Sequence, residues 1–221
     1  MNVLEDEGGL DALRALGARS VPVVARDGKF VFAQLIKDVV AFLDLNEDVS
    51  PTLSPAALVA RGDAIWQAAS QYCAQMPEAA LAKELPNRPR SYRVLMHHIF
   101  QIPLAFLEAR QSTQGLTYEA LVAPPPDDVL TSADIAAFGD SVRARFAAWA
   151  AAEGDTLGQG EMKTYYGAQP VHEVIERTVW HSTQHVRQIM SLLEREGQTV
   201  DRPLTADLLA DLPLPGPVWD A

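Results

Sequence analysis

From Ser54 onward the sequence contains four stretches with apolar side chains at helical spacing, each bounded by proline, glycine or a capping residue. We expect the first helix to be capped by Ser54 and to begin at Pro55. The next two cover residues 90–111 and 132–153, and the fourth has Pro170 in its first turn and ends at Gly197. Four helices of roughly 20 residues each are typical of a four-helix bundle.

The chain around this bundle is divided by composition. Residues 1–48 predict a small α/β unit, in which Asp27-Gly28 marks a hairpin between two helical stretches. Residues 49–54 are a polar linker, residues 55–196 the bundle, and residues 197–221 a proline-rich tail that we expect to form a strap or a short helix. The fold class expected is mainly α, with no strand after residue 48 and with loops at 115–130 and 154–169.

Charge and cysteine content exclude several classes of function. The net charge of -11 repels phosphate backbones and anionic lipid, so we expect neither nucleic-acid nor membrane binding. The only cysteine, Cys73, allows no intrachain disulfide, and we expect it to be buried. The sequence has no apolar signal-peptide region and no run of about 18 apolar residues, so a cytoplasmic protein is expected.

The five histidines are confined to two of the predicted helices. His181 and His185 lie four residues apart, about 40° around the helix axis, so both rings leave one face. Val174, Thr178, Gln188 and Leu192 share this mostly apolar face. Because two imidazoles buried without partners are costly, a divalent metal is one way to satisfy both.

A third ligand is expected from the second helix. His98 continues a core-facing stripe there, whereas His97 points about 100° away and is expected to face solvent or a helix junction. Three protein ligands leave coordination positions open, as in catalytic metal sites. Ser182 stands where a zinc protease of the HExxH type has glutamate, so that class has no general base here. A pair of histidines bonded within the core is the alternative to a metal site.

Other residues are candidates for supporting roles. Pro103 removes one helical hydrogen bond and frees the carbonyl of Ile99, next to His98. Arg187 is a candidate for holding an anionic substrate or is simply solvated. Four polar residues are candidates for orienting the imidazoles, and two tyrosines for lining the pocket mouth: Gln101, Thr178, Glu176 and Gln188, and Tyr165 and Tyr166.

The segments "RSYRVLMHHIFQI" and "YYGAQPVHEVIERTVWHSTQHVRQIMSLLE" resemble the second and last helices of the DinB-like (YfiT-like) metalloenzyme superfamily. The resemblance covers residues 55–196. It implies a four-helix bundle, often a homodimer, and a divalent metal held by three histidines. The ligands then fall on His98, His181 and His185, with His97 as the alternative to His98 in the doublet.

The segment "GARSVPVVARDGKFVF" resembles the C-terminal half of a glutaredoxin, and Val21-Pro22 matches the Val-Pro step that is cis in that fold. The CxxC-bearing helix and the strand before it are absent, and Ala33 stands where glycine is usual. Dithiol redox chemistry is therefore excluded. We expect a docked remnant that caps the bundle, with a retained thiol-binding surface as the alternative.

The DinB-like resemblance implies a metal-dependent transferase or isomerase that acts on a small-molecule substrate with a low-molecular-weight thiol. Zinc or nickel is the metal expected, with iron as a further candidate. A metal-dependent hydrolase on the same site is one alternative. A non-enzymatic metal-binding or stress-response protein is the other.

Overall fold

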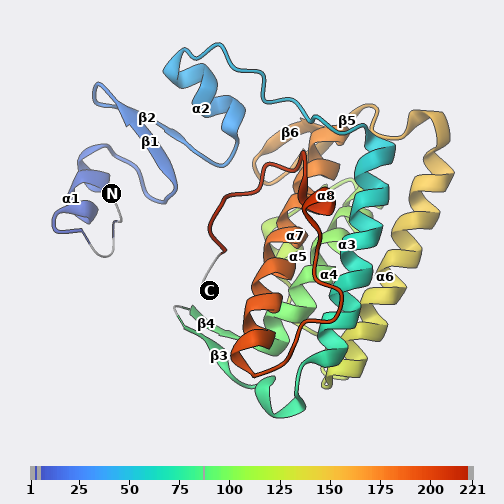
Figure 1. The fold of residues 1–221 in the computed structure, drawn as a ribbon. Coiled ribbons are helices and arrows are strands. Elements are labelled where there is room, and N and C mark those ends of the chain that lie inside the picture. Colours follow the sequence, from blue (N-terminus) through green and yellow to red (C-terminus); the bar gives the residue numbers. More distant parts are fainter. Residues whose placement is uncertain (1–2, 4–5, 87, 219–221) are drawn as a thin grey trace. The chain divides into compact units, whose positions relative to one another are not determined.

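The computed structural model describes residue 3 and residues 6–86 and 88–218. This part of the chain is mainly helical, with small antiparallel sheets (Figure 1). It divides into two compact units, residues 1–50 and residues 51–221. None of the described helices combines the length and the apolar character that a membrane span requires.

The first unit contains two helices and one hairpin. Helix α1 (Gly9–Ala15) precedes strands β1 (Val23–Arg26) and β2 (Lys29–Phe32), and helix α2 (Ile36–Leu43) follows them. The strands pair antiparallel around the predicted turn, where Asp27 and Gly28 both have positive φ. The hairpin expected at Asp27-Gly28 is confirmed. The Val21–Pro22 peptide bond is cis.

Four long helices make up most of the second unit, and all four begin and end close to the predicted positions. Ser54 caps α3 (Pro55–Gln75) and Ser91 caps α4 (Tyr92–Gln111), each by accepting a hydrogen bond from a backbone N–H of the first turn. Thr131 and Asp134 form a capping box for α6 (Ser132–Glu153). Helix α7 (Val171–Arg195) starts directly after Pro170.

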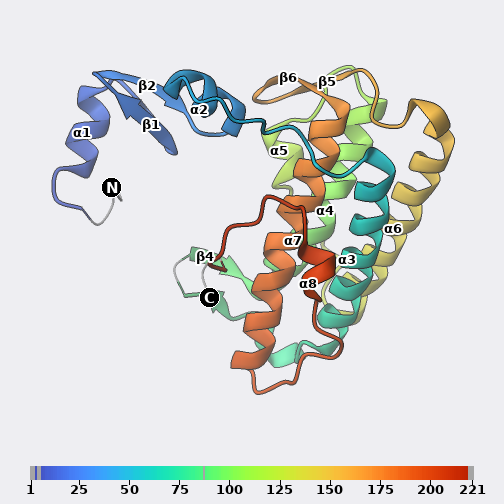
Figure 2. The same ribbon diagram turned by 45° about the horizontal axis from the view of Figure 1, so that its top comes forward.

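The first two of these helices each pack against the last two. Both α3 and α4 pack against α6 and α7, and the four run side by side in Figures 1 and 2. The core between them is apolar and closed, and Cys73 lies fully buried in it, as expected. Burial raises the pKa of the Cys73 thiol, which keeps it protonated and unreactive.

Two hairpins contradict the expectation that no strand follows residue 48. A short helix also lies in a stretch that was expected to be a loop. Strands β3 (Glu84–Leu85) and β4 (Arg88–Ser91) lead into α4, after the 3₁₀ turn η1 (Glu78–Ala80). Strands β5 (Glu161–Thr164) and β6 (Gly167–Pro170) lead into α7, after η2 (Gly154–Thr156). Helix α5 (Tyr118–Leu121) lies in the predicted loop at 115–130. These strands are only two to four residues long, too short for a periodic signal.

The β5–β6 hairpin is fixed at one end of α7. Leu116 donates its N–H to the carbonyl of Lys163 at 2.9 Å, which joins the segment before α5 to β5. Gly115 allows this approach, because a Cβ at this positive-φ residue would lie 2.3 Å from that carbonyl oxygen. The turn residues Tyr165 and Tyr166 are thereby held beside α5.

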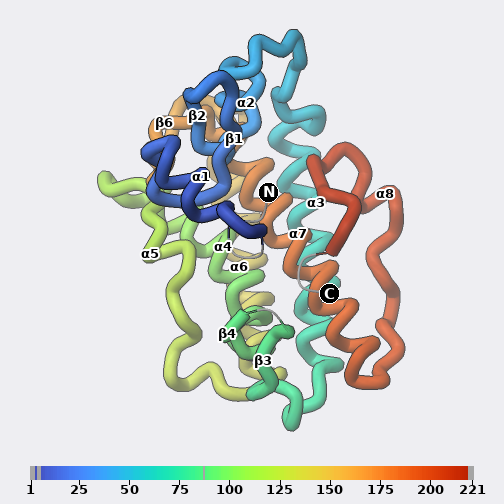
Figure 3. The backbone as a smooth tube through the Cα atoms, turned by 90° about the vertical axis from the view of Figure 1, so that its left-hand side faces the viewer, coloured from blue at the N-terminus to red at the C-terminus, as the bar shows by residue number. Residues whose placement is uncertain are grey.

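The tail after α7 returns along the long helices as an extended segment with one short helix, α8 (Ala206–Leu209), as Figure 3 shows. Arg61 of α3 donates to the carbonyls of Leu208 and Ala210, and Tyr72 donates to the carbonyl of Arg202. The strap expected for residues 197–221 therefore packs on α3 over the described part of the tail.

We predict that Gly139→Ala destabilises the protein. A Cβ at this position in α6 would lie 2.5 Å from the fully buried ring of Phe100, and overpacking of this kind costs about 1–3 kcal/mol. That cost exceeds the gain of about 1 kcal/mol that alanine brings to a helix. Urea unfolding measures the difference. The exposed Ser141→Ala in the same helix is the control, and a Gly139→Ala protein as stable as wild type would contradict this packing.

Candidate metal centre

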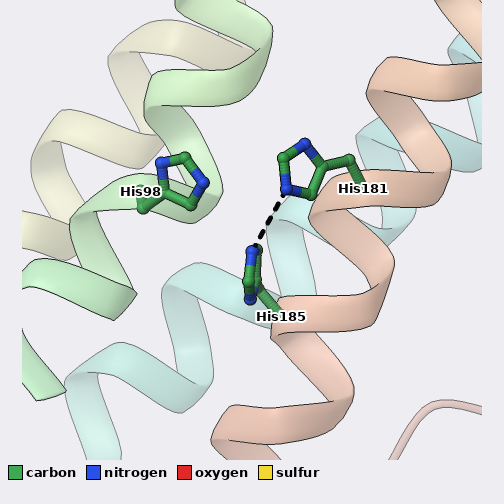
Figure 4. Close-up of side chains that lie close together, drawn as sticks. All are labelled: His98, His181 and His185. Atoms are coloured by element: carbon green, nitrogen blue, oxygen red, sulfur yellow. Dashed lines mark hydrogen bonds between the residues drawn. The ribbon is translucent and has the colours of Figure 1, made fainter. Parts of the chain in front are cut away.

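Three imidazoles meet between α4 and α7, as Figure 4 shows. His98 comes from α4, and His181 and His185 come from consecutive turns of α7. One ring nitrogen of each lies within 4.8 Å of those of the other two. His98 and His185 are buried, while His181 is partly exposed.

The spacing of the rings suits a tetrahedral metal site. The Nε2 atoms of His181 and His185 are 3.3 Å apart and hydrogen-bonded to each other, as the alternative to a metal site expects (Figure 4). The same distance suits two ligands of one metal ion. Two imidazole nitrogens at about 2.0–2.1 Å from one zinc ion, at tetrahedral angles, are separated by about 3.3–3.4 Å. The ring centroids are 5.3 Å apart for His98 and His181 and 5.1 Å for each of the other two pairs. The same tetrahedral geometry gives about 5.2 Å for such centroids.

Hydrogen bonds at the other ring nitrogens orient two of the imidazoles. Nδ1 of His185 lies 3.1 Å from Oε1 of Gln188, so a proton on Nδ1 donates to this acceptor and Nε2 keeps its lone pair. The ring of His98 hydrogen-bonds to the backbone carbonyl of Leu121, at the end of α5. Such partners fix the tautomer and direction of metal-binding histidines, so these two rings fit a metal.

Burial keeps these histidines neutral, which is the form that binds metals. Burial, and then the charges of neighbouring groups, lowers the pKa of His98 to about 2. Burial lowers the pKa of His185 to about 4, although the hydrogen bond that its ring donates to Gln188 raises it. Burial also lowers the pKa of His181 well below its usual range. The cation of Arg90, on β4, contributes to all three shifts.

Helices α4 and α7 are held together at this level by one side-chain hydrogen bond. Ser182 donates its hydroxyl to the carbonyl of Ile99 at 2.9 Å, and both residues are fully buried. This carbonyl is the one that Pro103 leaves without its helical N–H donor. Ser182, next to His181, thus satisfies the carbonyl next to His98. The position that carries glutamate in an HExxH motif serves here to join the two ligand-bearing helices.

A pocket adjoins the partly exposed His181. It holds about 280 Å³ of space, part of which is open to solvent. Its wall is apolar on the side of α4 and α5, and its polar groups come from α7 and the β5–β6 turn. Besides His181, the lining residues are Ile102, Leu116, Leu121, Val174, Tyr165, Tyr166, Arg177 and Thr178.

Of the residues expected to support the site, one contacts a ligand, three line the pocket, and Gln101 does neither. Gln188 contacts His185, and Tyr165, Tyr166 and Thr178 line the pocket. Gln101 donates to the carbonyl of Ala120 at 2.9 Å, which holds α5 in place, and Thr178 donates to Val174 within its own helix. Neither therefore orients an imidazole directly.

The structure decides between the alternatives for two further residues. His97 lies at a helix junction rather than in solvent: it is 1% exposed and stacks on Phe138 of α6 with ring centroids 4.7 Å apart. Arg187 is not among the pocket residues, because its guanidinium donates to the carbonyls of Pro215 and Gly216 in the tail. Both placements depend on contacts with segments distant in sequence.

Arg177 is a pocket residue that could not be recognised from the motifs alone. It lies four residues before His181, just as His181 lies four residues before His185. This spacing places all three side chains on one face of the helix and is the sequence signal that indicates Arg177. Glu176 is partly buried near His172 and Glu173, and burial raises the pKa of its carboxyl.

No protein-family model matches the sequence, and no curated protein is significantly similar to it. Three neutral imidazoles, two of them oriented by hydrogen bonds and one at a pocket, can hold a divalent transition metal.

We predict that Ser182→Ala destabilises the protein by about 1–3 kcal/mol, because the buried carbonyl of Ile99 loses its donor. Pro103→Ala restores a backbone N–H to that carbonyl, so Ser182→Ala should cost much less in the Pro103→Ala background. Urea unfolding of the four proteins measures this coupling. The control is Thr183→Val, because the hydroxyl of Thr183 donates within its own helix. Equal costs of Ser182→Ala in both backgrounds would contradict the role of Ser182.

We predict that the metal-free protein loses stability as the pH falls below about 6.5. The pKa values of His98 and His185 lie at about 2 and about 4 in the folded chain, below the ordinary value of 6.5, so the unfolded chain binds protons first. Their stabilising contribution is complete above pH 6.5 and is lost as the pH falls toward those values. Each histidine adds up to about 1.4 kcal/mol per pH unit. Denaturant unfolding from pH 7.5 to 5 measures the slope, and His98→Gln should reduce it. An unchanged slope in that variant would contradict the buried neutral state.

Proposed function

We propose that this protein is a divalent-metal-dependent enzyme that uses a small thiol to attack an electrophilic substrate, as an S-transferase or an isomerase. The observation that carries the proposal is the group formed by His98, His181 and His185, in which the partly exposed ring adjoins a pocket. Three protein ligands with an accessible side are typical of catalytic rather than structural metal sites.

The arrangement of the four long helices supports a DinB-like four-helix bundle. In that family, as in bundles generally, facing helices supply the ligands of a metal site. Here α4 and α7 pack directly against each other and carry all three histidines. The motif resemblance and the position of the imidazoles therefore support the same assignment.

The metal, when bound, would lower the pKa of a thiol and so supply a thiolate nucleophile at neutral pH. Zinc or nickel fits three neutral imidazoles best, and iron fits less well without a carboxylate ligand. The side chains around the site have separate tasks. Gln188 and the carbonyl of Leu121 orient His185 and His98, and the apolar wall formed by Ile102 and Val174 limits the access of water.

A thiol-dependent reaction suits the pocket better than hydrolysis does. A hydrolase with water as its nucleophile usually places a carboxylate or a free histidine nearby as general base. The residues that line the described pocket include no Asp or Glu, and His181 is their only histidine. A thiol with a lowered pKa needs no such base at neutral pH.

The central prediction is that the purified protein binds one equivalent of zinc or nickel and that His181→Ala lowers this affinity at least about 100-fold with the fold intact. Elemental analysis and metal titration measure binding, and circular dichroism reports the fold. The matched control is His172→Ala, because His172 is on the same helix but bonds to the carbonyl of Leu53. A His98→Ala and His97→Ala pair decides which member of the doublet is the ligand, and we expect His98.

The reaction is tested with the metal-loaded protein, a series of small thiols and 1-chloro-2,4-dinitrobenzene as electrophile. We expect thiol conjugation that a chelator abolishes and that added metal restores. If the wild-type protein binds no transition metal, the proposal is wrong. If it binds metal but the metal accelerates conjugation with none of the thiols, the thiol reaction is wrong.

A further inference from the structure

The pocket beside His181 contains one cationic side chain, Arg177. Positions 177, 181 and 185 are separated by four residues each, so Arg177 lies one helical turn beyond the histidine pair on the pocket side of α7. It is partly buried, as are Tyr166 and His181. An arginine in this position brings a permanent positive charge to the pocket.

Aromatic rings hold the guanidinium of Arg177. It lies 4.7 Å from the centroid of the Tyr166 ring and 5.9 Å from that of the Trp180 ring. A guanidinium stacked on a ring face keeps its N–H groups in its own plane, where they can donate in pairs to a carboxylate. Glu173, one turn before Arg177, also acts electrostatically on Tyr166 and so belongs to the surroundings of this cation.

Tyr166 supplies a second polar group to the same pocket. Its hydroxyl is buried and the side chain lines the pocket. It makes no close hydrogen bond among the described residues, and the side chain of Thr164 is near enough only for a weak one. A ligand oxygen in the pocket would accept a stronger hydrogen bond from this hydroxyl.

The charges around the site also favour an anion. The three imidazoles are neutral, and the cations of Arg90, Arg88 and Arg177 each act on at least one of them. The residues that line the pocket include no carboxylate, and Glu173 is the acidic side chain that acts on Tyr166 beside it. An anionic group on the substrate would be attracted by Arg177 and by a divalent ion at the histidines.

We propose that the pocket selects a small substrate that carries a carboxylate, held by the guanidinium of Arg177 and the hydroxyl of Tyr166. The proposal rests on the proposed metal centre and adds the chemical class of its ligand. Much of the pocket's space of about 280 Å³ is open to solvent, so only a small group of the substrate enters between the lining side chains. Its uncharged part lies against the apolar wall of Ile102, Leu121 and Val174.

The test compares two thiols that differ only in charge, 3-mercaptopropionate and 3-mercaptopropionamide, on the full-length protein loaded with cobalt(II). The visible absorption bands of cobalt report both metal uptake and thiol binding. We expect the carboxylate to bind at least about tenfold more tightly than the amide, the range of one charge-assisted hydrogen-bonded pair. Arg177→Gln should bring this ratio close to one and leave the affinity for the amide unchanged.

Arg90→Gln is the matched control, because Arg90 also acts on the three histidines but is not among the pocket residues. Its loss removes a charge but no group that lines the pocket, so it should lower the ratio less than Arg177→Gln does. Tyr166→Phe keeps the ring under Arg177 and removes only the hydroxyl, so it should lower the ratio in part. This second variant tests the pocket even if Arg177→Gln folds poorly.

The outcomes separate the two proposals. If the wild-type protein takes up no cobalt, the metal centre is wrong and the carboxylate pocket is rejected with it. If cobalt binds but the two thiols bind equally well, only the carboxylate pocket is wrong. A ratio that survives Arg177→Gln and Tyr166→Phe, or that Arg90→Gln reduces to the same extent as Arg177→Gln, also contradicts the pocket assignment.

Discussion

The hydrogen bond from Ser182 to the carbonyl of Ile99 joins the two helices on which the site depends. Pro103 removes the helical N–H donor of the Ile99 carbonyl in the buried middle of α4. Ser182 supplies a donor from α7, between His181 and His185 in sequence. The bond joins the two helices at the level where His98 of α4 lies opposite the histidine pair.

Burial and charge then determine what these rings can do. The apolar core keeps the imidazoles neutral, so they present lone pairs rather than protons. Arginines near the site make a positive potential that a metal ion would increase. A bound anion is the natural partner of such a centre, and Arg177 with Tyr166 offers groups to hold one. The metal centre and the anion pocket are thus parts of one electrostatic arrangement.

The long helices and the histidine group could be predicted from the sequence because their signals are local. Ser54 and Pro55 mark the start of α3, and the four-residue spacing of His181 and His185 places both rings on one face. The freed carbonyl of Ile99 was predictable too, but its partner was not, since Ser182 is distant in sequence. The surroundings of His97 and Arg187 could not be predicted for the same reason: Phe138 and the tail, which cover them, belong to other segments. The β5–β6 hairpin turns through two tyrosines, and these give no turn signal of the Asn-Gly kind.

The central claim is that His98, His181 and His185 hold a divalent metal together. X-ray absorption at the zinc edge of the zinc-loaded protein tests it most directly, because imidazole rings give a distinct multiple-scattering pattern. We expect three imidazole nitrogens at about 2.0–2.1 Å and one further light atom, with one imidazole fewer in His98→Gln. A zinc shell without imidazole scattering, or one that His98→Gln leaves unchanged, would contradict the three-histidine centre.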